Sequence, residues 1–139
     1  MAQFIELLSR DFQNFLEQHD FKIETAHEGQ LHVIYNPDFN VKVYDCMGHG
    51  FGVNTNLCSS FDTSIYEGDE MAMYWVFKYF DLQEQSNFSA RTKEAYLKNL
   101  QLLYSDLQLV IIRLLDFGSD FWNEPAMRIN LLAKEHFKN

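Results

Sequence analysis

The sequence predicts an α+β fold with an N-terminal helix, a four-stranded antiparallel meander and three C-terminal helices packed on one face of the sheet. Apolar residues recur at three- and four-residue spacings near the N-terminus and again after residue 68, which is the period of a helix with one buried side. Between residues 21 and 57, apolar and polar residues alternate and turn sequences separate the runs, which indicates short strands. No linker or internal repeat interrupts the 139 residues, so we expect residues 1–139 to form a single domain.

The first helix is expected to end near His19 and Asp20. One apolar stripe with helical spacing comprises Phe4, Leu8, Phe12, Phe15 and Leu16. The residues between them are mostly charged or polar, so the helix should bury one side and expose the other.

Four strands joined by short turns are expected next. Their alternating segments are Phe21–Thr25, Leu31–Tyr35, Val41–Asp45 and Phe51–Leu57. The strongest turn is Asn36-Pro37-Asp38, because proline presets φ and the flanking side chains accept local hydrogen bonds. Strands linked in this way form a meander, and we expect one of its faces to be apolar and the other to be wet.

Residues 58–68 show no period and are expected to form a surface loop. A buried helix is predicted from Gly68 or Asp69 to Phe80, because its apolar residues leave little polar face. A polar linker follows over residues 83–88. These boundaries place the loop between the meander and the helical part of the chain.

The longest periodic segment predicts a helix from about Ser89, as N-cap, to Gly118, as terminator. Its densest stripe contains Leu103, Leu107 and Val110, which we expect to lie in the core. A last helix should begin at Asn123, with Pro125 in its first turn. Its expected inner residues are Met127, Leu131, Leu132 and Phe137.

The net charge of −9 and the pI of about 4.8 oppose binding to nucleic acid or to an anionic membrane, which carry the same sign of charge. A basic protein is a better electrostatic match. The charge is uneven, because residues 61–88 hold six carboxylates against the single cation Lys78. Such a segment is either a solvated surface that keeps the chain soluble or an anionic patch that docks a basic partner.

The two cysteines, Cys46 and Cys58, are too few and too far apart for the disulfide framework of a small secreted domain. The N-terminus shows no signal peptide, and no segment approaches the length of a spanning helix. We therefore expect a cytoplasmic protein that folds without metal or disulfide and is a monomer or a weak dimer.

No motif predicts a catalytic residue, a metal ligand or a cofactor. Cys46 and His49 are the only local pair with catalytic residue types, and we interpret them as turn residues. The neighbouring glycines lack the lysine and the following helix of a phosphate cradle. Glu67, Asp69 and Glu70 have the chemistry for an ion or for acid–base work, but Asp69 and Glu70 also suit the start of the helix that they precede.

The loop and its acidic flank are the predicted partner-binding site. Two aromatic residues, Phe61 and Tyr66, would form an apolar centre, with carboxylates around them as a polar rim. The rim residues are Asp62, Glu67, Asp69 and Glu70. The sheet face around Tyr35, Tyr44 and Phe51 is the next candidate.

The chain resembles bacterial immunity proteins of polymorphic-toxin and contact-dependent inhibition systems. The resemblance covers the whole chain and is one of architecture: small size, acidity, and a helix, meander and helices around Tyr35-Asn36-Pro37 and Val41–Asp45. It implies a protein that binds a cognate toxin and blocks its active site, and it transfers no residue role. Two alternatives stay open: a small enzyme or ligand-binding domain that uses the turn at residues 45–50, and a structural domain that forms a homo-oligomer.

Overall fold

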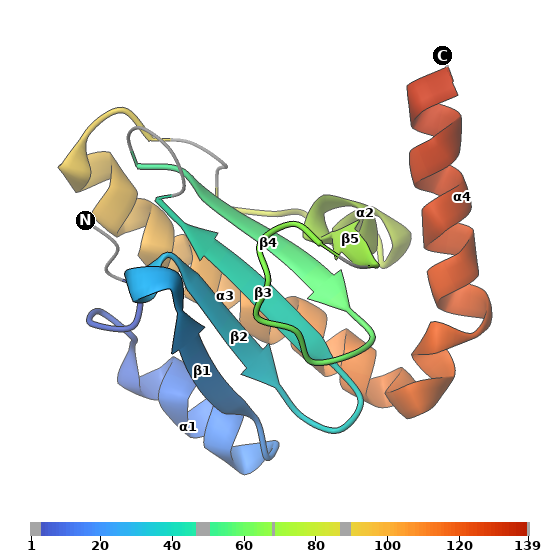
Figure 1. Cartoon of the computed structure of the whole chain (residues 1–139), viewed down its shortest axis with the longest axis horizontal. Coiled ribbons are helices and arrows are strands. Elements are labelled where there is room, and N and C mark those ends of the chain that lie inside the picture. Colours follow the sequence, from blue (N-terminus) through green and yellow to red (C-terminus); the bar gives the residue numbers. More distant parts are fainter. Residues whose placement is uncertain (1–3, 47–50, 68, 87–89, 139) are drawn as a thin grey trace.

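The computed structural model describes residues 4–46, 51–67, 69–86 and 90–138, and its architecture is α+β (Figure 1). The strands form one antiparallel sheet in chain order, which confirms the predicted meander. They are β1 (Lys22–Ala26), β2 (Leu31–Tyr35), β3 (Asn40–Asp45), β4 (Val53–Cys58) and β5 (Glu70–Ala72). The helices are α1 (Arg10–Gln18), α2 (Met73–Tyr79), α3 (Lys93–Phe117) and α4 (Glu124–Lys138), with short 3₁₀ turns η1 (His27–Gly29) and η2 (Gly118–Trp122).

The fifth strand corrects the prediction of four strands. β5 occupies the first turn of the helix expected from Gly68 or Asp69, so α2 begins only at Met73. Met71 pairs with Leu57 and turns into the core, and Glu70 pairs with Cys58 and turns to the opposite face of the sheet. These two residues therefore have the alternation of a strand, and Glu70 does not cap a helix.

α1 begins later than its apolar stripe suggested. The hydroxyl of Ser9 accepts a hydrogen bond from the Phe12 amide at 3.1 Å, which makes Ser9 the N-cap. Phe12, Phe15 and Leu16 are buried as predicted. Phe4 is also buried, but it precedes the helix and packs there as part of an irregular segment.

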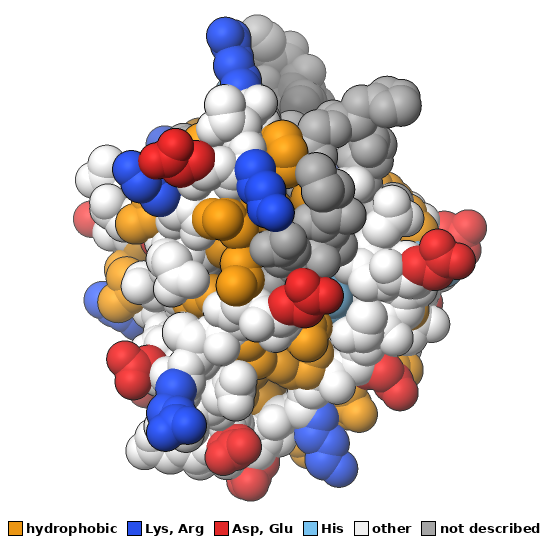
Figure 2. Space-filling model, turned by 90° about the vertical axis from the view of Figure 1, so that its left-hand side faces the viewer, with side chains coloured by type: hydrophobic (Ala, Val, Ile, Leu, Met, Phe, Trp, Pro, Cys, Tyr) orange, Lys and Arg blue, Asp and Glu red, His pale blue; other side chains and the backbone are white. Residues whose placement is uncertain are grey.

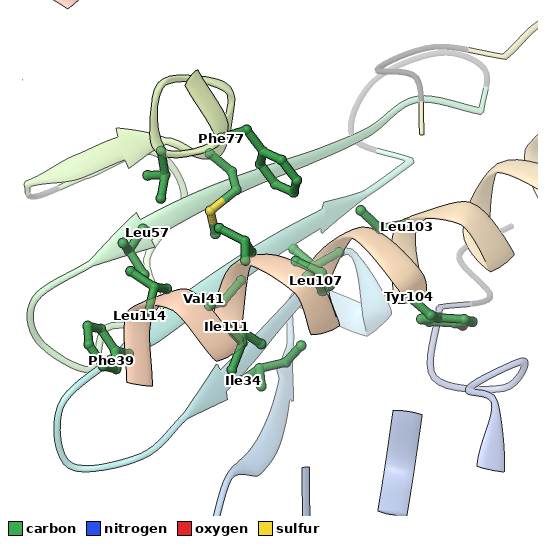
Figure 3. Packing of buried hydrophobic residues seen from close by; sticks show 14 of the residues in the cluster. Ile34, Phe39, Val41, Leu57, Phe77, Leu103, Tyr104, Leu107, Ile111 and Leu114 are labelled. Carbon is green, nitrogen blue, oxygen red and sulfur yellow. The ribbon is translucent and has the colours of Figure 1, made fainter. Parts of the chain in front are cut away.

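α3 lies behind the sheet and forms most of the core with it (Figures 1 and 3). The predicted core residues Leu103, Leu107 and Val110 are buried, which confirms that stripe. The helix begins at Lys93 with Thr92 as its N-cap, so the predicted cap at Ser89 is wrong; Ser89 itself lies outside the described residues. Gly118 ends the helix with φ of +61°, a conformation that favours glycine.

α4 stands at one end of the sheet, where it contacts α2 and η2 (Figure 1). It packs through Ala126 and Ile129, whereas Met127, Leu131 and Leu132 are exposed, so their predicted inward placement is wrong. α4 has apolar residues on more than one side, and the side that contains Ala126 is the one that contacts α2 and η2. The predicted Phe137 side chain lies outside the described part of the chain.

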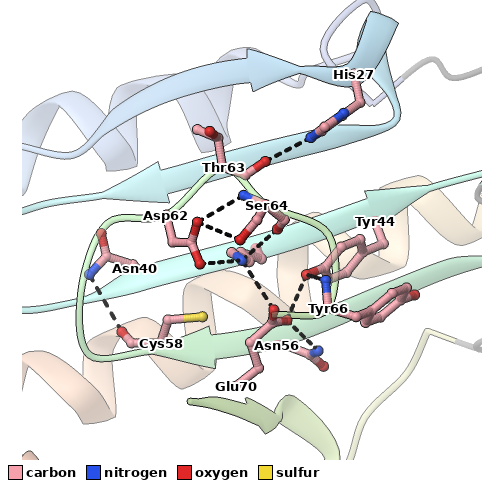
Figure 4. A network of polar contacts seen from close by, with 11 residues as sticks. His27, Asn40, Tyr44, Asn56, Cys58, Asp62, Thr63, Ser64, Tyr66 and Glu70 are labelled. Atoms are coloured by element: carbon pink, nitrogen blue, oxygen red, sulfur yellow. Dashed lines mark hydrogen bonds and ion pairs between the residues drawn. The ribbon is translucent and has the colours of Figure 1, made fainter. Parts of the chain in front are cut away.

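The outer face of the sheet, opposite α3, is not wet as predicted. Residues 59–67 run across β3 and β4 on that side (Figures 1 and 4), and we call this segment the covering loop. All six residues of β3 are buried, because α3 covers the side chains on one face and the covering loop those on the other. Within the described segments, no helix combines the length and apolar character that crossing a membrane requires.

Candidate functional site

A buried ammonium group holds the covering loop on the sheet. Lys42 projects from the outer face of β3 and its side chain is 0% exposed. Its Nζ donates to the Ser64 carbonyl at 2.7 Å and to Glu70 Oε2 at 3.1 Å, and Asp62 Oδ2 lies 3.6 Å away (Figure 4). A buried charge is tolerated only when it is paired and hydrogen-bonded, so Lys42 ties the loop to β5.

Glu70 is the second centre of this network. Its side chain is 7% exposed, and its Oε1 accepts hydrogen bonds from Tyr44 Oη at 2.6 Å and from Asn56 Nδ2 at 2.9 Å. The Tyr44 oxygen in turn accepts from the Tyr66 amide at 3.0 Å. Burial and the bond to Glu70 raise the pKa of Tyr44, which keeps its hydroxyl a neutral donor.

The loop also supports its own shape. Asp62 accepts hydrogen bonds from the Ser64 amide at 2.9 Å and the Ser64 hydroxyl at 2.6 Å, and these bonds, with a smaller contribution from Lys42, lower the pKa of Asp62. His27 Nε2 donates to the Thr63 carbonyl at 2.8 Å, which joins the loop to η1. Hydrogen bonds therefore attach the covering loop both to Lys42 beneath it and to η1 beside it.

Two aromatic side chains of the covering loop face solvent above this network. Phe61 is 47% exposed and its ring meets Tyr35 edge-on, with 4.8 Å between centroids. Tyr66 is 53% exposed and stacks on Tyr44 at 4.1 Å. Each ring thus rests on a strand residue and presents its remaining surface outward.

The predicted site residues divide into two groups. Phe61, Tyr66, Glu67 and Asp69 are at the surface, as a binding role requires. The Glu70 side chain is only 7% exposed and binds Lys42, whereas the Asp62 side chain is 35% exposed and lies 3.6 Å from the Lys42 ammonium, so both carboxylates support the loop from beneath. Sequence reasoning missed Lys42, because its alternation with apolar neighbours is also what a wet face would show.

The second predicted surface does not exist as one patch. Tyr44 is buried under the covering loop, and Tyr35 is half-buried. Phe51 is also half-buried and its ring packs near Tyr96, which belongs to the main core on the other side of the sheet. These three aromatic residues therefore cannot contact one partner together.

A second polar cluster lies inside the molecule, where α3 meets the start of the described chain. Asp45 is 0% exposed, and its carboxylate accepts hydrogen bonds from the Phe4 amide at 2.9 Å and from Tyr96 Oη at 2.7 Å. His32 lies beside it, with Nε2 at 4.0 Å from Asp45 Oδ2 and Nδ1 at 3.0 Å from Thr25 Oγ1. Burial lowers the pKa of His32 and outweighs the attraction of Asp45.

Because of this histidine, we expect the stability of the protein to fall in mild acid. The unfolded chain protonates His32 near pH 6.5, whereas burial lowers the pKa of His32 in the folded chain. The stability that the neutral His32 contributes is therefore fully present above pH 6.5 and is lost as the pH falls toward the folded pKa. Each unit of depression corresponds to about 1.4 kcal/mol. We expect wild type to lose unfolding free energy between pH 7.5 and 5.5, measured by urea denaturation, and His32→Gln to lose less. Equal losses in the two proteins would contradict this role.

Cys46 has the wrong environment for a nucleophile. Its thiol is buried and lies 3.4 Å from Asp45 Oδ1, and burial and the nearby carboxylate raise its pKa. Burial and Glu70 likewise raise the pKa of Cys58 to about 12. The enzyme alternative at residues 45–50 gains no support from the Cys46 thiol, and His49 lies outside the described residues.

Within residues 4–46, 51–67, 69–86 and 90–138, no group of three or more histidine, cysteine, aspartate or glutamate side chains is placed to hold a metal ion. In comparisons with known proteins, no family model, no curated protein and no solved structure matches the chain.

Proposed function

We propose that this chain is an acidic, cytoplasmic protein-binding module whose covering loop docks a basic protein. The observation that carries the proposal is a pair of large aromatic side chains, Phe61 and Tyr66, left half-exposed on a loop held from beneath by Lys42 and Glu70. Glu67, which follows Tyr66 in the sequence, and Asp69 are also exposed. Phe61 rests on Tyr35 and Tyr66 rests on Tyr44, and these supports lie four residues apart along the β2–β3 ladder. The loop therefore supports two aromatic contacts, with the carboxylate of Glu67 beside one of them.

The hydrogen bonds that order the covering loop support the proposal as well as its aromatic and acidic residues do. Aromatic residues dominate binding energy at interfaces, and a loop ordered before binding loses less conformational entropy on association. The hydrogen bonds of Ser64 and Tyr66 to strand residues provide that order. The loop thus offers a preformed surface, and Lys42, although fully buried, acts as a positioning residue for it.

The net charge of the whole chain also favours a basic partner. On the face shown in Figure 2, lysine, arginine and acidic side chains are interspersed with hydrophobic ones. The net charge of −9 still gives the whole chain an attractive field for a basic partner, which speeds diffusional encounter. A toxin-neutralising immunity protein is the specific form of the proposal, because an acidic inhibitor can occupy the basic surface of a nuclease toxin.

Reversing the charge of Glu67 tests the proposed role of its carboxylate. The partner to use is the purified product of the reading frame directly upstream. In Glu67→Lys, we expect the association rate to fall on the order of tenfold at low salt and the dissociation rate to change less, because rim charges steer encounter. Stability should barely change, since exposed charges contribute little to folding.

The matched control is Asp116→Lys, which makes the same charge change at an exposed position of α3. It should slow association less than Glu67→Lys does. Equal effects of the two reversals would mean that only net charge matters, and this would remove the covering loop from the interface. Failure of the upstream product to bind would count against the immunity assignment.

A further inference from the structure

A groove of about 580 Å³ lies between α4 and the β5 end of the sheet. One wall includes Ser59, Asp69 and Met71, and the other includes Met127, Leu131 and Lys134 of α4. The volume falls within the range of pockets that bind drug-sized molecules or a few peptide residues. Because Ser59 belongs to the covering loop, the groove continues the proposed docking surface.

The first wall is the end of a sheet. Among the described residues, β5 pairs with β4 alone, so it is the last strand on that side. An edge strand presents main-chain donors and acceptors to which another extended chain can add. α4 stands beyond β5 and α2 at this end of the molecule (Figure 1) and makes the hollow a groove rather than an open edge.

The second wall supplies apolar surface. Met127 and Leu131 are four residues apart on α4, so they share one side of the helix, and they are 59% and 53% exposed. Asp69 adds an exposed carboxylate from the opposite wall. The main-chain edge and the apolar strip match an extended segment with apolar side chains. Asp69 and Lys134 make the local charge of the groove mixed, so the preference for a basic segment comes from the net charge of −9 together with Asp69.

We infer that this groove binds an extended cationic segment of the protein partner, which adds beside β5 as a further strand. An apolar side chain of the segment packs against Met127 and Leu131, and a lysine or arginine lies toward Asp69. The inference rests on the proposed function, since it assigns part of the same basic partner to a second contact. A second copy of this chain is a poorer occupant, because each copy carries a net charge of −9.

The probe is the acetylated and amidated peptide Lys-Leu-Lys-Val-Lys-Leu-Lys, titrated into labelled full-length protein and followed by amide and methyl NMR. We expect shifts at the amides of Met71 and Ala72 and at the methyl groups of Met127 and Leu131. The same peptide with glutamate in place of lysine should bind on the order of tenfold more weakly. N-methylation of its three central residues should abolish binding, because it removes main-chain donors.

Matched variants on α4 separate the groove from the rest of the helix. Leu131→Glu should weaken peptide binding on the order of tenfold, whereas Leu132→Glu should leave it unchanged. Both side chains are exposed, at 53% and 42%, but only Leu131 lines the groove. Equal effects of the two variants, or undiminished binding of the N-methylated peptide, would overturn the inference.

Two outcomes distinguish this inference from the proposed function. If Glu67→Lys slows the whole partner while Leu131→Glu does not change its affinity, the covering loop stands and the groove fails as its second contact. If both variants bind the partner like wild type, both proposals fail. A dimer in sedimentation that Leu131→Glu dissociates would make a second copy the occupant, and this would also overturn the inference.

Discussion

Replacing Lys42 with alanine is expected to lower the free energy of unfolding by about 3–5 kcal/mol, because it leaves a buried carboxylate without its counter-charge. The stranded group is Glu70, whose side chain is 7% exposed. The Ser64 carbonyl also loses its donor. The measurement is guanidinium denaturation at pH 7, and the loss should appear as a lower midpoint with little change in slope.

The double variant Lys42→Met with Glu70→Gln is the control. It removes both charges, and the glutamine carbonyl can still accept from Tyr44 and Asn56, which now bind Glu70 Oε1. Neutral replacement of a buried pair is often tolerated, so we expect much of the lost stability to return. A loss below about 1 kcal/mol for Lys42→Ala would contradict the burial of this pair.

Leu107→Ala is expected to lower the free energy of unfolding by about 2–5 kcal/mol, since it opens a cavity in a closely packed layer. Leu107 is 0% exposed and lies between α3 and the sheet, near Val41 and Ile111 (Figure 3). Chemical denaturation at neutral pH measures the change.

Leu109→Ala makes the same substitution on the same helix at a side chain that is 48% exposed. It controls for helix propensity, and its cost should stay within about 1 kcal/mol. Comparable losses at Leu107 and Leu109 would mean that α3 does not bury the side that faces the sheet.

These core positions could be predicted from sequence because their signal is periodic. The stripe of α3 and the alternation of β1 to β4 each extend over several residues, so that a buried side is evident before any contact is known. β5 has three residues, too few to show an alternation, and its glutamate also suits a helix start. The sequence therefore predicts the start of α2 too early, at a segment that forms β5.

The inner side of α4 was misassigned for a different reason. Apolar residues lie on more than one side of this helix, and sequence cannot say which side the neighbours cover. Its contacts depend on where α2 and η2 lie, and Ala126 and Ile129 fill them. Met127 and Leu131 remain exposed and form a wall of the groove.

The candidate loop was found from sequence, but its support was not. Lack of period marked residues 58–68 as irregular, and Phe61 and Tyr66 stood out as aromatic residues among carboxylates. Lys42 lies 28 residues from Glu70 and 22 from Ser64 in the sequence, and no local pattern joins them. Only the folded sheet brings the ammonium group beneath the loop.

The proposed binding of the partner by Phe61 and Tyr66 is tested by the dissociation constant of the variant Phe61→Ala with Tyr66→Ala. The control is Tyr74→Ala with Leu109→Ala, two side chains that are each 48% exposed outside the covering loop. We expect affinity for the upstream gene product to fall on the order of a hundredfold in the loop variant and to stay near wild type in the control. Wild-type affinity in a folded loop variant would show that these two aromatic side chains do not bind the partner.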